Sequence, residues 1–384
     1  MIKNIIIPLL AVIVLTYGYF FFTCIRKKRW WWQLLYVLVA AFVVWQSIRA
    51  ATWRDYFPDS VNEMMWVVTM LVVCVAAPAV VALCQVVGAG LKHRRRGTIV
   101  GWSLVVVGLA VYAYGILVGS KKLEIRYETF YSADLPEAFD GYRIVHVSDL
   151  HVGSYIGSRV KLLQEAIDSI NAQDADIVAI TGDLQNKQPD EIEPHLSLLS
   201  TIKGKDGVFS VLGNHDYAEY IDKTDAFRVS ANLGLIRSYE KDMGWTLLNN
   251  GHVRIDRDSA SIYIAGMEND GEGRFPQLGD IQHTLFGLNP QDHDFVVMLE
   301  HDPSAWHRKI LPHSHTQLTL SGHTHGGQIA LFGWYPASIG FRECCGMYYQ
   351  GERAMHVTKG LGAVVPFRFG ASPEIVVITL HRKK

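Results

Sequence analysis

Four long apolar stretches in the first 120 residues constrain the fold of this 384-residue chain more than any other feature. They cover residues 5–24, 31–51, 64–87 and 99–118, and charged residues are confined to their ends and connections. Each approaches or exceeds the ~20 residues that a helix needs to cross ~30 Å of hydrocarbon. No small-residue cleavage pattern follows the first stretch, so we expect it to be retained. The sequence therefore predicts an all-α transmembrane anchor with four helices over residues 1–120.

The basic residues of the short connections predict the orientation of this anchor. Arg26-Lys27-Lys28-Arg29 joins the first two stretches, and residues 92–96 join the last two with four more cations. Since Lys and Arg stay on the cytoplasmic side, we expect a multi-pass cell-membrane protein with everything after residue 120 on the extracytoplasmic face. The stretches hold no carboxylate or histidine that would mark an ion path. We therefore interpret them as an anchor in contact with membrane lipids.

The remaining residues, 121–384, have a different composition and predict a separate catalytic domain. Residues 1–120 carry 11 Lys and Arg against 3 Asp and Glu, whereas the rest carry 25 against 34. This negative balance makes nucleic acid an unlikely partner. Short β-branched runs alternate with helical segments, which is typical of a layered α/β domain. One helix is expected over Ser158–Asn171 with Ser158 as its N-cap, and Asn269–Asp292 reads as a long surface loop. The expected strands are Tyr142–Ser148, Asp176–Thr181, Val208–Leu212, Ser261–Ala265, Asp294–Leu299 and Gln317–Ser321.

Five of these runs lead directly into side chains that can bind a metal ion. In α/β sheets, ligands sit beyond the carboxyl ends of the strands, so these side chains should converge. A glycine precedes three of them and permits a sharp turn and close backbone approach. The candidate ligands are Asp149, His151, Asp183, Asn214, His301, His323 and His325.

The chemistry of these seven donors restricts the metal. Two Asp, one Asn and four His offer oxygen and imidazole donors and no thiolate. Such a set suits Mn, Fe, Zn or Ni. Seven side chains exceed the needs of one tetrahedral ion, so we expect two divalent metal ions that share one bridging carboxylate.

The order of these motifs resembles that of the calcineurin-like binuclear metallophosphoesterases over about residues 124–380. The matching strings are Asp149-x-His151, Gly182-Asp183, Gly213-Asn214-His215-Asp216, His301 and Gly322-His323-Thr324-His325. The strings at 322–329 and 359–362, with Pro366 and 373–375, resemble the bacterial membrane-associated branch. That branch includes pyrophosphatases acting on a UDP-diacylglucosamine lipid precursor. The resemblance implies a sandwich of two mixed β-sheets flanked by helices.

The resemblance also implies roles for individual residues. One ion would be held by Asp149, His151, Asp183 and His325, and the other by Asp183, Asn214, His301 and His323, with Asp183 as the bridge. A hydroxide activated by the two metal ions would attack the phosphorus. We assign His215 to catalysis, as the group that protonates the leaving oxygen. Asp216 either orients that imidazole or caps the next helix.

These inferences predict a membrane-anchored, metal-dependent phosphoesterase. Its substrate would be a phosphate ester or pyrophosphate, with lipid-linked cell-envelope compounds as one candidate. The alternatives are a metal-dependent nuclease or nucleotide phosphodiesterase, and a non-catalytic membrane sensor that retains the metal site. The sequence leaves open the preference among monoester, diester and pyrophosphate, the metal in the cell and the oligomeric state.

Overall fold

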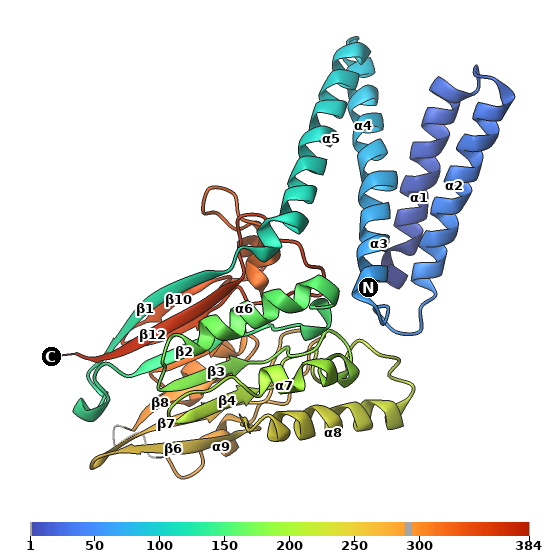
Figure 1. Cartoon of the computed structure of the whole chain (residues 1–384). Coiled ribbons are helices and arrows are strands. Elements are labelled where there is room, and N and C mark those ends of the chain that lie inside the picture. The colour runs from blue at the N-terminus through green and yellow to red at the C-terminus, as the bar shows by residue number, and fades with distance from the viewer. Residues whose placement is uncertain (1, 289–293, 384) are drawn as a thin grey trace. The chain divides into compact units, whose positions relative to one another are not determined.

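The computed structural model describes residues 2–288 and 294–383 and divides into two compact units, Met1–Tyr114 and Gly115–Lys384. Figure 1 shows an all-helical first unit and a second unit that contains all the labelled strands. Each unit is described by itself below. The predicted domain boundary after residue 120 stays a prediction.

The N-terminal helices match the four predicted apolar stretches. The segments that are long and apolar enough to cross a membrane are Ile6–Ile25, Trp30–Ala51, Val61–Gly90 and Arg94–Lys121. Within them, the α-helices are α1 (Ile2–Phe20), α2 (Trp30–Ala51), α3 (Val61–Leu71), α4 (Ala77–Gly90) and α5 (Arg94–Leu117). At most 28% of the apolar window of any segment is buried, as expected for helices that face lipid. A π-helical turn, Val72–Ala76, joins α3 to α4 just before Pro78, where the proline cannot donate a backbone hydrogen bond.

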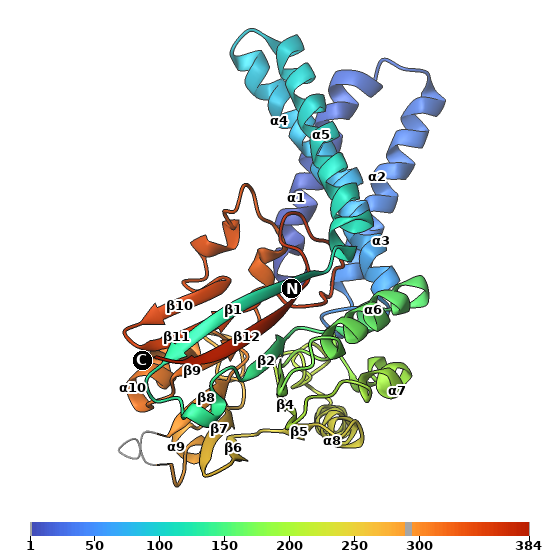
Figure 2. The ribbon, with the colours of Figure 1, turned by 60° about the vertical axis from the view of Figure 1, so that its left-hand side comes forward.

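The second unit is built on two six-stranded mixed sheets (Figures 1 and 2). The first sheet has the strand order β1 (Glu124–Ser132), β12 (Glu374–Arg382), β2 (Arg143–Val147), β3 (Ile177–Thr181), β4 (Gly207–Val211) and β5 (Thr246–Leu247). The second has the order β10 (Gly346–Gln350), β11 (Arg353–Val357), β9 (Leu318–Ser321), β8 (Phe295–Leu299), β7 (Ala260–Gly266) and β6 (Gly251–Arg257). The central strands β2, β3 and β4 are parallel to one another, as are β7, β8 and β9.

Alternate side chains of the central strands pack into different apolar layers. Ile144 of β2 and Val297 of β8 lie in a layer with residues of both sheets, and their neighbours Val145 and Val296 face helices. Because both strand faces are buried, these strands are apolar at almost every position. The helices of this unit are α6 (Val160–Asn171), α7 (Leu196–Leu199), α8 (Ala226–Asp242), α9 (Ile281–Thr284) and α10 (Leu311–His313). The expected sandwich of two mixed sheets flanked by helices is therefore confirmed.

All six predicted strands are present, but two local predictions were wrong. Ser158 does not cap α6; it lies in a 3-10 turn, and Arg159 occupies the N-cap position without a side-chain cap. The segment Asn269–Asp292 is also more than a surface loop. Asn269 and Asp270 are fully buried, and Asp270 forms ion pairs with Arg308 and Lys309. Residues 289–293 lie outside the described residues.

Glu240 on α8 gives the domain a pH-dependent stability. Its buried carboxyl group is hydrogen-bonded to Ser210 of β4. Burial raises the pKa of Glu240 to about 8, so the folded state keeps a proton that the unfolded chain releases at lower pH. The free energy of unfolding should therefore fall as the pH rises from about 5 to about 8, by on the order of a few kcal/mol.

We expect Glu240→Gln to flatten this pH dependence, since the amide keeps the shape of the side chain and cannot ionise. Hydrogen exchange of α8 peptides in the full-length protein, between pH 5 and 8.5 and corrected for intrinsic exchange, measures the effect. Glu165→Gln on the exposed face of α6 is the control. Parallel pH profiles for Glu240→Gln and the wild type would contradict the prediction.

Candidate functional site

The seven candidate ligands lie on loops that leave the carboxyl ends of strands from both sheets. Asp149 and His151 follow β2, Asp183 follows β3, and Asn214 follows β4. His301 follows β8, and His323 and His325 follow β9. The loops bring all seven side chains into one largely buried cluster. Six of them, together with His215, form three overlapping groups whose donor atoms lie within 4.8 Å of one another, and Asn214 contacts His301 and His323 of these groups. The convergence expected from the strand ends is therefore present.

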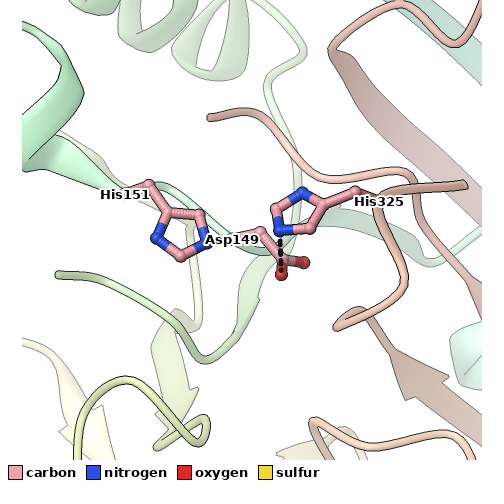
Figure 3. Close-up of side chains that lie close together, drawn as sticks. All are labelled: Asp149, His151 and His325. Atoms are coloured by element: carbon pink, nitrogen blue, oxygen red, sulfur yellow. Dashed lines mark ion pairs between the residues drawn. The ribbon is translucent and has the colours of Figure 1, made fainter. Parts of the chain in front are cut away.

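Asp183 lies at the centre of this cluster. Its Oδ2 atom is 3.3 Å from His301 Nε2 and 3.7 Å from His151 Nε2. Asp149 Oδ1 lies 3.4 Å from His325 Nε2, and Figure 3 shows these two side chains beside His151. A carboxylate between two sets of imidazoles has the arrangement that a bridging ligand requires.

The Asn214 amide completes the second half of the cluster. Its Oδ1 atom is 2.8 Å from His323 Nδ1 and 3.2 Å from His301 Nε2. The amide nitrogen of Asn214 donates to Tyr220 Oη at 2.8 Å, which turns the amide oxygen toward the imidazoles. His301 Nδ1 lies 2.6 Å from the Thr181 carbonyl oxygen. A proton on Nδ1 would be donated to that carbonyl and would leave the Nε2 lone pair available to a metal.

Most of these ligands have a left-handed backbone conformation. The φ angles are positive at Asp149 (51°), His151 (45°), Asp183 (57°), His323 (69°) and His325 (51°). Such a conformation costs a non-glycine residue ~1–3 kcal/mol and persists only where the surroundings impose it. Strain of this kind concentrates at functional sites, which makes it independent support for this location.

Two glycines are required because other residues approach them closely. A Cβ atom on Gly213 would lie 2.3 Å from Asp183 Oδ1, and one on Gly322 would lie 2.0 Å from Ser148 Oγ and 2.4 Å from Asp149 Oδ2. Any side chain at either position would displace a candidate ligand. The close backbone approach expected from the glycines that precede the ligands is therefore observed.

Burial and mutual charge determine the protonation of the cluster. Burial lowers the pKa of His151 and of His325 well below the usual range, so both imidazoles are neutral at pH 7. Burial alone would raise the pKa of Asp183, but His301 and His215 beside it lower the pKa well below its usual range. Burial likewise works against a charged His301, yet the Asp183 carboxylate raises its pKa to about 10. The cluster thus offers neutral imidazoles at His151 and His325 and an ionised carboxylate at Asp183, which are the forms that bind cations. The raised pKa of His301 keeps a proton on its imidazole, and a bound cation would have to displace that proton.

Unsatisfied polar atoms test whether the cluster suits a metal ion. Within the described residues, Asp149 Oδ1 and both ring nitrogens of His151 are buried without a hydrogen-bond partner. Leaving a buried polar atom unpaired costs ~1–3 kcal/mol. A cation at this position would supply the missing partner for the carboxylate oxygen and for one imidazole nitrogen. The donors present therefore fit divalent metal ions.

His215 lies at the edge of the cluster. Its Nε2 atom is 4.0 Å from Asp183 Oδ2, and its Nδ1 atom is 2.5 Å from the Asn186 carbonyl oxygen. The ring stacks on Tyr220 with 4.1 Å between centroids. The His215 side chain is 11% exposed, whereas those of His151 and His301 are fully buried. Its position combines contact with the cluster and access from outside.

The Asp216 carboxylate holds two ligand loops together. It accepts hydrogen bonds from the backbone N–H groups of Asp183 (2.7 Å), Leu184 (3.0 Å) and Gly213 (2.9 Å). These amides belong to the loops after β3 and β4. The next helix, α8, is capped by Asp225. The contacts of Asp216 thus make it a positioning residue for Asp183 and Asn214.

Sequence reasoning did not find the residues that support His325. Arg368 is 1% exposed and donates to the carbonyl oxygens of His325 (3.0 Å), Lys359 (2.8 Å) and Gly362 (2.6 Å). Lys359 in turn pairs with Glu374 at 2.9 Å. The sequence signals for this region were the string at 359–362, Pro366 and residues 373–375, and none of them indicated the contacts with Arg368. Gly360 of that string lies so close to Asp149 that an added Cβ would be 2.7 Å from the Asp149 Cβ.

Comparison with known proteins agrees with this geometry. Residues 142–327 match the family described as calcineurin-like phosphoesterase. An uncharacterized metallophosphoesterase of Bacillus subtilis, YkuE, is 31% identical over 277 residues, which are 70% of this chain and 89% of that protein. A Danio rerio transmembrane protein with a metallophosphoesterase domain is 31% identical over 65% of this chain, and the match spans 55% of its own length. Among solved structures, a dimetal phosphatase from Danio rerio aligns with 60% of this chain and 94% of its own at 12% identity and a TM-score of 0.34.

The chain therefore belongs to the calcineurin-like phosphoesterase family. This family is metal-dependent, and the cluster around Asp183 is the candidate metal site of this member. Four apolar helices and the transmembrane relatives further indicate a membrane protein.

We expect Asp216→Ala to weaken metal binding although Asp216 belongs to no group of metal donors. Loss of three amide contacts should loosen the loops that carry Asp183 and Asn214 and lower metal affinity by ~10–100-fold. Asp216→Asn keeps one acceptor oxygen, so its metal affinity should lie between those of the wild type and Asp216→Ala. Competition with a chromogenic chelator in the full-length protein measures this, with Asp242→Ala as the surface control. Wild-type metal affinity in Asp216→Ala would rule out the positioning role.

Proposed function

We propose that this chain is a membrane-anchored, metal-dependent phosphoesterase that hydrolyses phosphate ester or pyrophosphate bonds in phosphorylated substrates, including lipid-linked compounds of the cell envelope. The observation that carries the proposal is the buried cluster of seven donors, with unpaired atoms on Asp149 and His151. A purely structural site would not need a partly exposed histidine beside the donors. His215 occupies that place and favours a catalytic site.

The ligand assignment follows the two halves of the cluster. Asp149, His151, Asp183 and His325 would hold one divalent ion, and Asp183, Asn214, His301 and His323 the other. Bound ions of this kind lower the pKa of a water molecule and neutralise charge on phosphoryl oxygens. Asp183 serves both halves because its two nearest imidazoles belong to different halves.

His215 would deliver a proton to the leaving oxygen. The Asn186 carbonyl oxygen accepts the Nδ1 proton, and Tyr220 holds the plane of the ring. The Nε2 atom then faces the cluster, where the scissile bond would lie. Protonated His215 can donate its Nε2 proton as the bond to the leaving group breaks. Charge that develops on the leaving oxygen is thus removed at a fixed position.

A cavity beside His323 provides room for the substrate. It has a volume of about 300 Å³, and its lining includes Phe275, Arg308 and Phe341. The Phe275 ring contacts the His323 ring edge-on, with 4.7 Å between centroids. The two aromatic rings suit an apolar part of a substrate. The charged lining is mixed, since Arg342 lies there with Glu272, Asp302 and Glu343, and Arg308 is paired with Asp270.

We expect His215→Ala to retain its metal and to lose ~10²–10³ in turnover, because one positioned donor is removed. Hydrolysis of bis(p-nitrophenyl) phosphate with added Mn²⁺, together with metal analysis of the same samples, measures both quantities. Asp183→Asn should lose metal and activity together, and His283→Ala on the exposed face of α9 is the control. Full turnover in His215→Ala would contradict its assigned role, and loss of metal would make it a ligand instead.

The basic connections support an extracytoplasmic position of the catalytic domain. In right-side-out spheroplasts, a membrane-impermeant maleimide should label Lys161→Cys on the exposed face of α6. Lys28→Cys, in the first basic connection, should be labelled only after permeabilisation. The wild type corrects for the native cysteines, of which Cys24 is exposed. The reverse pattern would place the domain in the cytoplasm.

A further inference from the structure

An exposed apolar loop projects from the catalytic domain between residues 331 and 341. Leu331, Phe332, Trp334 and Ile339 are all exposed large apolar side chains, and Phe332 is fully exposed and Ile339 83% exposed. Contiguous apolar surface is rare on soluble domains because water disfavours it, and it commonly marks an interaction site. Four such residues within nine positions make this loop a candidate interaction surface.

The tip of the loop is a tight turn with an unfavourable residue. Leu331 and Trp334 exchange backbone hydrogen bonds of 2.8 and 3.0 Å, and the two residues between them have positive φ angles, 52° at Phe332 and 83° at Gly333. Turns of this type favour Asn, Asp or Gly at both central positions. An aromatic residue here costs backbone energy and also exposes an apolar ring. The fully exposed Phe332 ring gains no packing within the domain that would offset the unfavourable backbone conformation or the exposed apolar surface. This indicates that Phe332 contacts a partner outside the domain.

The base of the loop is tied to the end of the last membrane helix. Ala330 N–H donates to the Phe369 carbonyl oxygen at 2.7 Å, and Phe369 N–H donates to that of Gln328 at 2.9 Å. One residue earlier, Arg368 N–H donates to the Gly115 carbonyl oxygen at 3.1 Å. Gly115 lies in the last turns of α5, belongs to the same compact unit as the loop, and is part of the apolar segment Arg94–Lys121.

This connection places the base of the loop beside the end of α5 within the second unit. The short segment 367–369 contacts the loop on one side and the end of α5 on the other. A spanning helix leaves the hydrocarbon near its end, so the base of the loop must lie close to the membrane surface. In Figures 1 and 2, the orange segment between β9 and β10 extends past the sheets near the beginning of β1.

We propose that the segment 331–341 is a membrane-inserting loop whose partner is the phospholipid bilayer. Phe332, Trp334 and Ile339 enter the interfacial region of the leaflet that faces the domain, where aromatic rings are favoured. The exposed cations Lys121, at the end of the apolar segment Arg94–Lys121, and Arg342, directly after the loop, would lie among the lipid headgroups. The loop thereby holds the catalytic domain against the membrane at a second point, besides α5.

Insertion has a consequence for the cavity beside His323. Gly340, Phe341 and Arg342, at the end of the loop, form part of its lining. The cavity therefore opens next to the lipid surface. A phosphate ester embedded in the leaflet would reach the cluster without leaving the bilayer. This consequence rests on the proposed function, whereas insertion itself does not.

Lipid quenching of a fluorophore at the loop tip tests the insertion without measuring activity. The full-length chain with Phe332→Cys is labelled with an NBD maleimide and reconstituted in vesicles of phosphatidylethanolamine and phosphatidylglycerol. Part of the lipid carries a doxyl group on its acyl chain. Phe227→Cys on α8 is the matched control, because Phe227 is an 85%-exposed phenylalanine of the same domain. Labelled wild type corrects for the five native cysteines.

We expect the probe at 332 to show blue-shifted emission and at least ~2-fold quenching by doxyl lipid, and the probe at 227 to show neither. Ile339→Cys should behave like the probe at 332 and serves as a second site if that variant folds poorly. Equal behaviour of 332, 339 and 227 would overturn the proposal. A blue shift without lipid quenching would also overturn it, since a protein surface such as a second copy of the chain would then cover the loop. Emission and quenching are measured independently of hydrolysis, so a lack of phosphoesterase activity would not change the conclusion about insertion.

Discussion

The buried charge around Asp183 is the constraint on which the rest of the catalytic domain depends. Two carboxylates and four imidazoles in a largely buried site are costly unless each donor atom has a partner. His301 satisfies part of this need, whereas Asp149 and His151 keep unpaired atoms. Divalent cations would be partners for these donor atoms, so relief of the unfavourable burial would contribute to the free energy of cation binding. The surrounding structure is understandable as the scaffold that keeps the donors in place.

Two scaffolding devices recur around the cluster. Left-handed backbone at most ligands turns their side chains inward directly after a strand, and the glycines beside them let loops from both sheets approach within contact distance. Buried acceptors and donors then fix the loops: Asp216 binds the amides after β3 and β4, and Arg368 binds the carbonyl oxygens near His325. Each of these features is locally unfavourable, and the packing of the two sheets stabilises the domain enough to maintain it.

The convergence of the candidate ligands and the long apolar helices could be predicted from sequence because each depends on a short pattern. Asp149-x-His151 and His323-x-His325 follow apolar runs whose two faces are both buried, and length and polarity alone identify the helices. The supporting residues could not be found in this way. Arg368 contacts His325 across 43 residues, and β12 joins β2 across more than 200, so no local periodicity records these pairings. The exposure of Phe332 could not be predicted either, because the sequence alone predicts that a large apolar residue lies in the core.

The strand order of the first sheet bears on how the chain is made in the cell. β12 lies between β1 and β2, and β1 pairs in parallel with β12 along its whole length. The ribosome produces β1 and β2 long before β12. During that interval the membrane helices can already insert, while the sheet lacks its second strand and leaves two edges open. Until residues 374–382 emerge, β1 has no neighbour within its sheet. Those unpaired edges are therefore exposed to unwanted strand pairing until the last strand is made.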